Sequence, residues 1–247
     1  MTTTTDTSAL SETINRYFPY LLEIRKRLLF VASLFVVATV VGFIYYEKIT
    51  STVLQFFSLK GVNIVFTSPF QFFSLAINSG LIAGLVVVFP LLLYQILAFL
   101  RPALHHREYK LILASLPLSV ILFVGGFGFG VLVMKYVVAT FYQKSLELHI
   151  GNFLDIELLL SHILVTGALM GVGFQFPIVM TFLMHFKVIT HKLIESQRPI
   201  IYIATLIFVL LLPPTDLVSD VLLFLPLVFL FELTLILNRV FLKTHLL

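Results

Sequence analysis

The amino-acid sequence predicts an all-α membrane protein in which six transmembrane helices form a single bundle. Hydrophobic residues make up 60% of the 247 residues and charged residues only 11%, and the mean hydropathy is +1.08. Ordinary soluble domains carry about 25% charged residues, so this chain is not a water-soluble globule. Apolar runs long enough to cross a bilayer recur along the chain, whereas the alternating pattern of a membrane β-barrel is absent from the sequence.

Six apolar segments, separated by polar or charged connections, define the predicted spans. A polar, Thr-rich tail over residues 1–15 comes first, and we expect it to be flexible. Residues 16–27 mix apolar and basic residues, which is typical of an amphipathic helix at the membrane surface. The six-helix membrane domain then covers residues 16–243, with spans at 28–45, 72–98, 111–140, 159–184, 200–212 and 220–238.

Two parts of this pattern differ from ordinary membrane helices. The third span would reach about 45 Å at 1.5 Å per residue, longer than a hydrocarbon core of about 30 Å. Its Gly126 and Gly130 have the small-xxx-small spacing with which membrane helices pack closely. The fifth span would reach only about 20 Å before Pro213 and Pro214 end it. We therefore expect the last helical hairpin to be too short for a normal bilayer.

The positive charges predict the orientation of the chain. Cytoplasmic or matrix-side connections of membrane proteins carry an excess of Lys and Arg. With six spans, both termini lie on the inner side. The inner segments then hold 12 of the 16 basic residues, and the outer side holds only Lys48, Lys60, Lys135 and Lys144.

Two carboxylates on the predicted inner face are candidates for binding a ligand. Glu108 stands among cations in the connection 99–110, and Glu23 lies in the basic segment before the first span. A carboxylate can receive a guanidinium through two parallel hydrogen bonds, which suits a ligand that carries arginine. The alternative is an ordinary membrane-surface loop, in which the cations fix topology and the carboxylates pair with them.

Polar side chains within the apolar segments are a second group of candidates. Gln175 lies inside the fourth predicted span and Glu232 inside the sixth. An unpaired amide is costly in a bilayer, so Gln175 either links helices of this chain or forms a polar site for an entering segment.

Several function classes lack support in the sequence. The chain has no cysteine, no phosphate-binding loop and no Gly-x-Ser-x-Gly sequence, and we expect no catalytic residues, metal or cofactor. We expect it not to be an enzyme, and its charge of +4 does not by itself indicate nucleic acid. A receptor for basic peptides, an ion-coupled small-solute transporter and a structural membrane-assembly scaffold all stay open at this point.

Five segments resemble, in order, the signature segments of TatC, the six-span subunit of the twin-arginine protein translocase. They read YLLEIRKRLL at 20–29, TSPFQFF at 67–73, FPLLLYQILAFLRPALHHRE at 89–108, GVGFQFPIV at 171–179 and LLPPTDLVSD at 211–220. The resemblance covers nearly the whole chain. It implies a glove-shaped bundle and transport driven by the proton-motive force.

The resemblance also implies particular site residues and partners. Twin-arginine signal peptides of folded cargo would bind on the inner face at Glu23, Arg25 and Glu108, and Pro69 and Asp216 match functional positions on the outer side. Gln175 and Glu232 match polar positions that contact partner helices. The implied partners are single-span subunits of the TatA and TatB type, within a receptor complex in which the chain is a homo-oligomer in the lipid bilayer.

Some positions depart from the usual pattern of that family. The usual His at the start of the first segment is Tyr20, a common Glu is Gln71, and the usual acidic residue of the fourth span is Gln175. Gln175, the many phenylalanines, the missing Trp and Cys and the lack of a recognisable targeting peptide resemble mitochondrially encoded members. We therefore expect a mitochondrial inner membrane, with a bacterial plasma membrane as the alternative.

Overall fold

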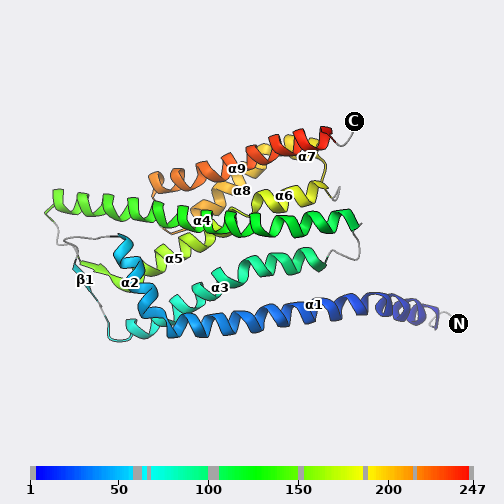
Figure 1. Ribbon diagram of the computed structural model, residues 1–247, viewed down its shortest axis with the longest axis horizontal. Helices are drawn as coiled ribbons and strands as arrows, with labels where there is room; N and C mark the ends of the chain where they lie inside the picture. Colours follow the sequence, from blue (N-terminus) through cyan, green and yellow to red (C-terminus); the bar gives the residue numbers. More distant parts are fainter. Residues whose placement is uncertain are drawn as a thin grey trace.

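The computed structural model describes residues 4–57, 63–65, 68–99, 106–149, 153–185, 189–213 and 216–244. Long helices lie side by side along one direction, as Figure 1 shows. The first helix begins, and the last helix ends, at the same end of this bundle, which we call the N/C end. The opposite end, which carries two short strands, is the far end. Termini on one side agree with the even number of spans in the predicted topology.

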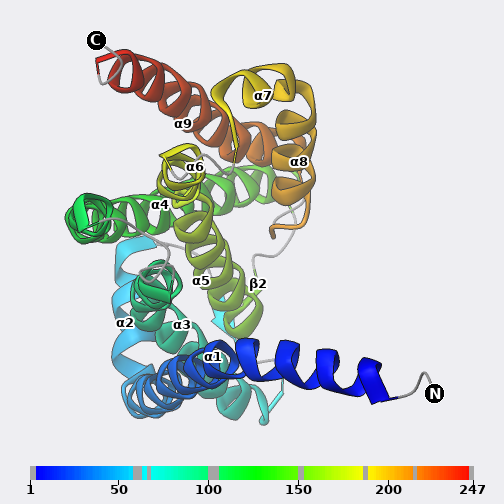
Figure 2. The same ribbon diagram turned by 90° about the vertical axis from the view of Figure 1, so that its right-hand side faces the viewer.

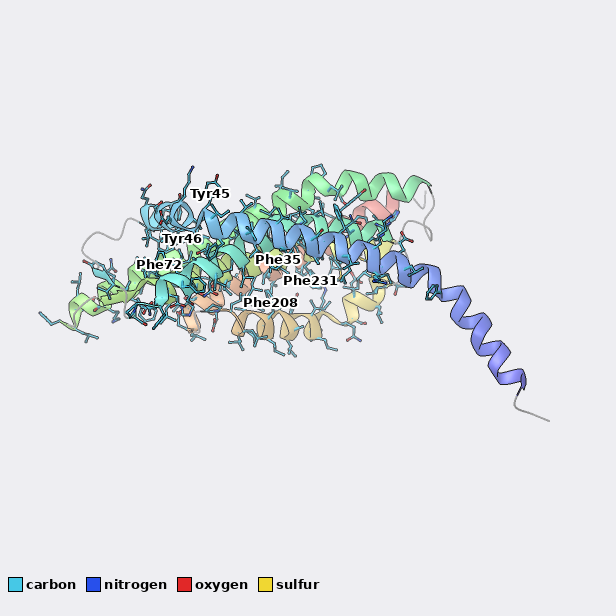
Figure 3. The ribbon with its side chains drawn as sticks, turned by 90° about the horizontal axis from the view of Figure 1, so that it is seen from below. Phe35, Tyr45, Tyr46, Phe72, Phe208 and Phe231 are labelled. Carbon is cyan, nitrogen blue, oxygen red and sulfur yellow. The ribbon has the colours of Figure 1, made fainter. Side chains whose placement is uncertain are left out.

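The first helix is longer than the sequence predicted. Helix α1 runs without a break from Thr4 to Ile44, so residues 4–15 are helical, while the expected flexibility of this segment stays a prediction. Residues 4–15 include Ala9 and Leu10 and lack Gly and Pro, so the backbone can continue the helix that the apolar part begins. The stretch of α1 that suits a membrane is Leu22–Ile44, against a prediction of 28–45. Its N-terminal part projects beyond the bundle (Figure 3).

Helix α1 packs against α3, Gln71–Phe99, through glycines. A methyl group added at Gly80 would lie 2.8 Å from the carbonyl oxygen of Thr39, and one at Gly42 would lie 2.7 Å from the Ala83 side chain. Only glycine permits such an approach of two helix backbones. The α1–α3 pair forms one side of the molecule (Figure 2).

The predicted glycine contact is confirmed between α4, His106–Glu147, and α5, Ile156–Gly173. A methyl group at Gly126 or Gly130 would come within 2.9 Å of the α5 backbone, whereas Gly125 and Gly128 face open space. Helix α4 has 42 residues and is longer than the predicted span. It also includes residues 106–110, which we predicted to lie in the connection. Residues 100–105 of that connection lie outside the described part of the chain.

The fourth predicted span is not one helix. It is α5 followed by α6, Phe176–His185, with a turn at Phe174 and Gln175 between them. Pro177 explains the break, because its ring has no N–H to donate and crowds the preceding helical turn. The break therefore places the polar residue Gln175 in the turn between α5 and α6.

The last helices match the predicted short hairpin only in part. Helix α8, Arg198–Leu210, has 13 residues and is short, as expected. Helix α9, Leu217–Thr244, has 28 residues, so the expectation of a short sixth span is wrong. The apolar stretch Leu217–Arg239 is long enough to cross a membrane because the helix extends past both predicted bounds. The short helix α7, His191–Ser196, precedes α8 at the N/C end.

At the far end, the structure contains elements that the sequence did not predict. Helix α2, Tyr46–Phe57, follows α1 directly, and strands β1, Asn63–Val65, and β2, Phe153–Asp155, pair in parallel. The rings of Tyr46 and Phe72 meet edge to face with centroids 5.4 Å apart, next to Tyr45 (Figure 3). Because β1 lies in the first predicted outer connection and β2 in the second, the strand pair joins these two connections.

The bundle has five helical stretches that are long and apolar enough to span a membrane, with α8 as a shorter sixth in the described part. Buried side chains such as Phe123, Phe231 and Ile163 fill the space between helices, while many large apolar side chains are exposed on the outside. A soluble protein would bury such side chains, whereas lipid accepts them. The architecture is therefore the predicted polytopic helical membrane fold.

Candidate functional site

Glu23 and Arg27 form a hydrogen-bonded ion pair on α1, toward the N/C end. They are four residues apart and therefore lie on one helix face. Arg27 donates from Nε and Nη2 to the same carboxylate oxygen, Glu23 Oε1, at 3.1 and 2.7 Å. The side chains are partly exposed, 27% for Arg27 and 37% for Glu23. Within the described part of the chain, no side chain or backbone N–H donates to the other oxygen, Oε2.

Arg27 also links α1 to α3. Its Nη1 donates to Gln95 Oε1 at 2.8 Å, so the guanidinium is held between a carboxylate and an amide. The amide comes from near the C-terminal end of α3, which approaches the N/C end. Arg25, a predicted site residue, lies between Glu23 and Arg27 on α1, and its side chain is exposed. The sequence did not point to Gln95, because its distance of 68 residues from Arg27 leaves no local signal.

Glu108 is placed only through its backbone. It is the third residue of α4, whose N-terminal end also lies at the N/C end. A negative charge in the first turn of a helix is favoured by the helix dipole. The Glu108 side chain lies outside the described part of the structure, so its predicted cooperation with Glu23 stays a prediction.

Gln175 is buried at the break between α5 and α6, with 2% of its surface exposed. Its Oε1 accepts a hydrogen bond from Ser119 Oγ at 2.7 Å. Its Nε2 donates to the carbonyl oxygens of Ser119, at 3.1 Å, and Gly171, at 3.4 Å. The amide therefore links α4 to the helix break, which is the structural alternative that the sequence left open.

A groove of about 400 Å³ runs beside Gln175. Its walls come from α3, the α5–α6 break, α8 and α9, and they are apolar except at Gln175 and Thr205. The other lining residues are Phe89, Leu93, Val172, Gly173, Phe176, Val179, Ile201, Ala204, Phe208 and Leu227.

Glu232 on α9 is engaged by two side chains of α8. Tyr202 donates its hydroxyl to Glu232 Oε1, and Arg198 Nη2 lies 3.5 Å from Glu232 Oε2. The Tyr202 ring also meets Phe231 edge to face. Glu232 therefore joins α8 and α9, the two helices of the last hairpin. Its predicted contact with a partner helix stays a prediction.

The predicted outer-side residues lie at the start of two helices. Pro69 is exposed in the turn that precedes α3. Asp216 precedes α9, and its Oδ2 accepts a hydrogen bond from the Ser219 N–H at 3.1 Å, which caps the helix. Its other oxygen, Oδ1, has no hydrogen-bond partner among the described residues.

Sequence reasoning missed a polar junction at the far end. Gln71 Nε2 donates to Asp155 Oδ2 at 2.6 Å, and Ser74 donates to Glu157 Oε1, so α3 is tied to the start of α5. Asp155 Oδ1 caps α5 by accepting from the N–H groups of Glu157 and Leu158. An acidic residue directly before an apolar helix is an N-cap signal that could have revealed this role.

Comparison with known proteins identifies the family. The model of "Sec-independent protein translocase protein (TatC)" matches residues 19–226. TatCy of Bacillus subtilis is 29% identical over 89% of this chain and 87% of its own, and the TatC protein of Haemophilus influenzae is 31% identical over 89% and 87%. The Escherichia coli TatC protein is 26% identical over 89% of this chain and 86% of its own.

The fold leads to the same family. A crystal structure of the twin arginine translocase receptor TatC superposes with a TM-score of 0.79 at 25% identity, covering 89% of this chain and 99% of the other. Residues 19–226, which the family model matches, include Glu23, Arg27 and Gln95. This chain therefore belongs to the TatC family of Sec-independent protein translocase proteins.

Proposed function

We propose that this protein binds the twin-arginine signal peptides of folded cargo at the N/C end of its bundle and starts their transport across the membrane. The observation that carries this proposal is the Glu23 carboxylate in a TatC-family chain, which is partly exposed and has Oε2 without a described partner. A guanidinium from a peptide can approach this oxygen from the surface. Basic residues around the site orient the chain, so the N/C end faces the compartment in which the cargo is made.

Arg25 and Glu108 complete the proposed binding site. Arg25 is exposed on the same stretch of α1, and α4 begins with Glu108 near its N-terminus at the same end. Two carboxylates at one surface would each receive one arginine of the pair. This arrangement favours arginine over lysine, because a planar guanidinium matches a carboxylate with two donors and an ammonium does not.

Single-span partners of the TatA and TatB type are proposed to dock along the apolar groove beside Gln175. The groove is partly open at the surface of the bundle and has few polar groups, which suits an apolar helix. Glu232 and its α8 partners lie on the neighbouring hairpin and offer a charged contact. Several copies of the chain would join these partners in a receptor complex driven by the proton-motive force. On the outer side, Pro69 and Asp216 are proposed to act in the same transport process.

The mitochondrial inner membrane is our proposed location. Support comes from composition, since the chain has 26 Phe and no Trp or Cys, and from Gln175 in place of an acidic residue. The relatives named above are bacterial, so a bacterial plasma membrane is the competing location. Fractionation of the source cells, with detection of this chain by mass spectrometry, distinguishes the two.

Photocrosslinking tests the proposed peptide binding. Membrane vesicles that contain the full chain are incubated with a photoreactive twin-arginine peptide, and with a twin-lysine peptide of the same sequence otherwise. We expect crosslinks to residues 16–27 and 99–110, weak labelling by the lysine peptide, and reduced labelling in Glu23→Gln and Glu108→Gln. Glu147→Gln is the matched control, because that carboxylate is exposed at the far end of α4. Equal labelling by both peptides, unchanged in both inner-face variants, would contradict the proposal.

A further inference from the structure

The carboxylate proposed to receive a signal arginine already holds a guanidinium of this chain. Arg27 places two N–H donors on Glu23 Oε1, at 2.7 and 3.1 Å. This is the same chemistry by which a peptide arginine would be recognised. Without a peptide, the Glu23 carboxylate is therefore already bound to Arg27. An incoming arginine has to compete with Arg27 for it.

We propose that Arg27 is a built-in competitor that occupies Glu23 when no peptide is bound and sets the concentration at which a twin-arginine peptide binds. Gln95 is the residue that holds the displaced guanidinium. This inference rests on the proposed peptide binding at Glu23 and adds the residue that tunes it.

The contacts of Glu23 allow an exchange of one guanidinium for another. Its Oε1 is occupied by Arg27, while Oε2 has no partner in the described part of the chain. An incoming guanidinium can therefore bind Oε2 first and then take over Oε1. Both side chains are partly exposed, so their pairing changes an equilibrium constant by no more than about fivefold. Such a pair lowers the apparent affinity of any guanidinium ligand for Glu23 by the same modest factor.

Arg27 has a place to go when it leaves Glu23. Its Nη1 already donates to Gln95 Oε1 at 2.8 Å, and this hydrogen bond can persist after the carboxylate is released. An apolar pocket of about 340 Å³ lies beside the arginine, between α1 and α3, and can take the aliphatic part of the side chain while the guanidinium stays on Gln95. The lining residues are Ile24, Arg27, Leu28, Val31, Leu92, Gln95 and Ile96.

Gln95 also explains why the displacement is reversible. A neutral amide oxygen is a weaker acceptor for a guanidinium than a carboxylate is. Arg27 therefore returns to Glu23 when the peptide leaves, and its tether to α3 keeps it within reach. The local pair closes the binding site again without any movement of the helices.

Peptide titration of the purified full chain in lipid nanodiscs tests this inference. Binding of a fluorescent twin-arginine peptide is measured for wild type, Arg27→Gln, Arg27→Lys, Lys26→Gln and Glu23→Gln. Arg27→Gln should tighten binding by up to about fivefold, because the competitor is gone. Arg27→Lys should tighten binding less but clearly, since it keeps the charge and loses the two-donor fork. It also serves as the second variant if Arg27→Gln does not fold.

Lys26→Gln is the matched control. It removes the same charge from the neighbouring exposed position, and no hydrogen bond or ion pair joins it to Glu23 in the described part of the chain. Tightening in Arg27→Gln that exceeds the Lys26→Gln effect by threefold or more supports the inference. If both variants change the affinity equally and Arg27→Lys equals wild type, Arg27 acts only through its charge and the inference is wrong. If Glu23→Gln binds the peptide as tightly as wild type, Glu23 does not receive a signal arginine, and both its place in the proposed function and this inference are wrong.

Discussion

The contact of α4 with α5 predicts opposite outcomes for two glycines only two residues apart. In Gly130→Ala, the new methyl group would lie 2.9 Å from the Gly167 Cα and 2.9 Å from the Thr166 carbonyl oxygen. Both are backbone atoms, which cannot turn aside as a flexible side chain can. Carbon atoms in contact normally lie about 3.5–4.0 Å apart, so the two helices must separate by about 0.6–1 Å.

The cost can be worked out by comparison with Gly128→Ala. Nothing lies within 4 Å of the methyl group that this variant adds. Both substitutions gain the same helix propensity, about 0.5–1 kcal/mol, so their difference isolates the steric term. Overpacking of a close contact costs about 1–3 kcal/mol. For a chain of this size, about 2 kcal/mol corresponds to a difference in melting temperature of about 4–8 °C.

Thermal unfolding in detergent, followed by far-ultraviolet circular dichroism, measures this difference. The backbone signal suits a chain without tryptophan, whose intrinsic fluorescence is weak. We expect Gly130→Ala to melt below wild type and Gly128→Ala to melt at or above it. If Gly130→Ala melted at the same temperature as Gly128→Ala or higher, the close α4–α5 contact would not limit stability, and the reasoning would be refuted.

Three further substitutions test other contacts. Gln175→Leu should lower the free energy of unfolding by about 1–3 kcal/mol, since it leaves the Ser119 hydroxyl without its acceptor; a thermal melt of this variant that matches wild type would contradict the link. Lys135→Met removes both a hydrogen bond to the Phe56 carbonyl oxygen and a cation–π contact 4.5 Å from its ring, so amide hydrogen exchange in α2 should speed up while α5 stays unchanged. Glu232→Gln should shift the melting temperature by no more than a few degrees, because its partly exposed ion pair contributes at most about 1 kcal/mol; a large loss of stability would show that the α8–α9 hairpin depends on that charge.

The helices were predictable because their causes are local. Apolar length marked the spans, and the spacing of Gly126 and Gly130 predicted a close contact that the structure confirms. The break before Pro177 also has a local cause, since proline lacks an N–H. We predicted a continuous span there because apolar length alone does not report a single turn at Gln175.

The contacts that define the candidate site were not predictable from local pattern. Gln95 lies 68 residues from Arg27, and Ser119 lies 56 residues from Gln175. Which polar groups meet is decided by how helices pack, and the sequence of one helix does not contain that information. The pairing of β1 with β2 was also not predictable from the local sequence, because each strand has only three residues and is stable only through its partner.

The glycine-lined contacts also bear on how the chain enters its membrane during synthesis. The α1–α3 and α4–α5 contacts, and the α8–α9 hairpin, join membrane helices that follow one another in the chain. Each pair can therefore associate as soon as its second helix leaves the ribosome, before the later helices exist. Contacts between neighbours in sequence have a low entropic cost of closure and form quickly. A glycine substitution that prevents one pairing would expose an unpaired helix to quality-control proteases during insertion. The amount of protein in cells should therefore fall by more than the lower melting temperature of the folded protein would predict.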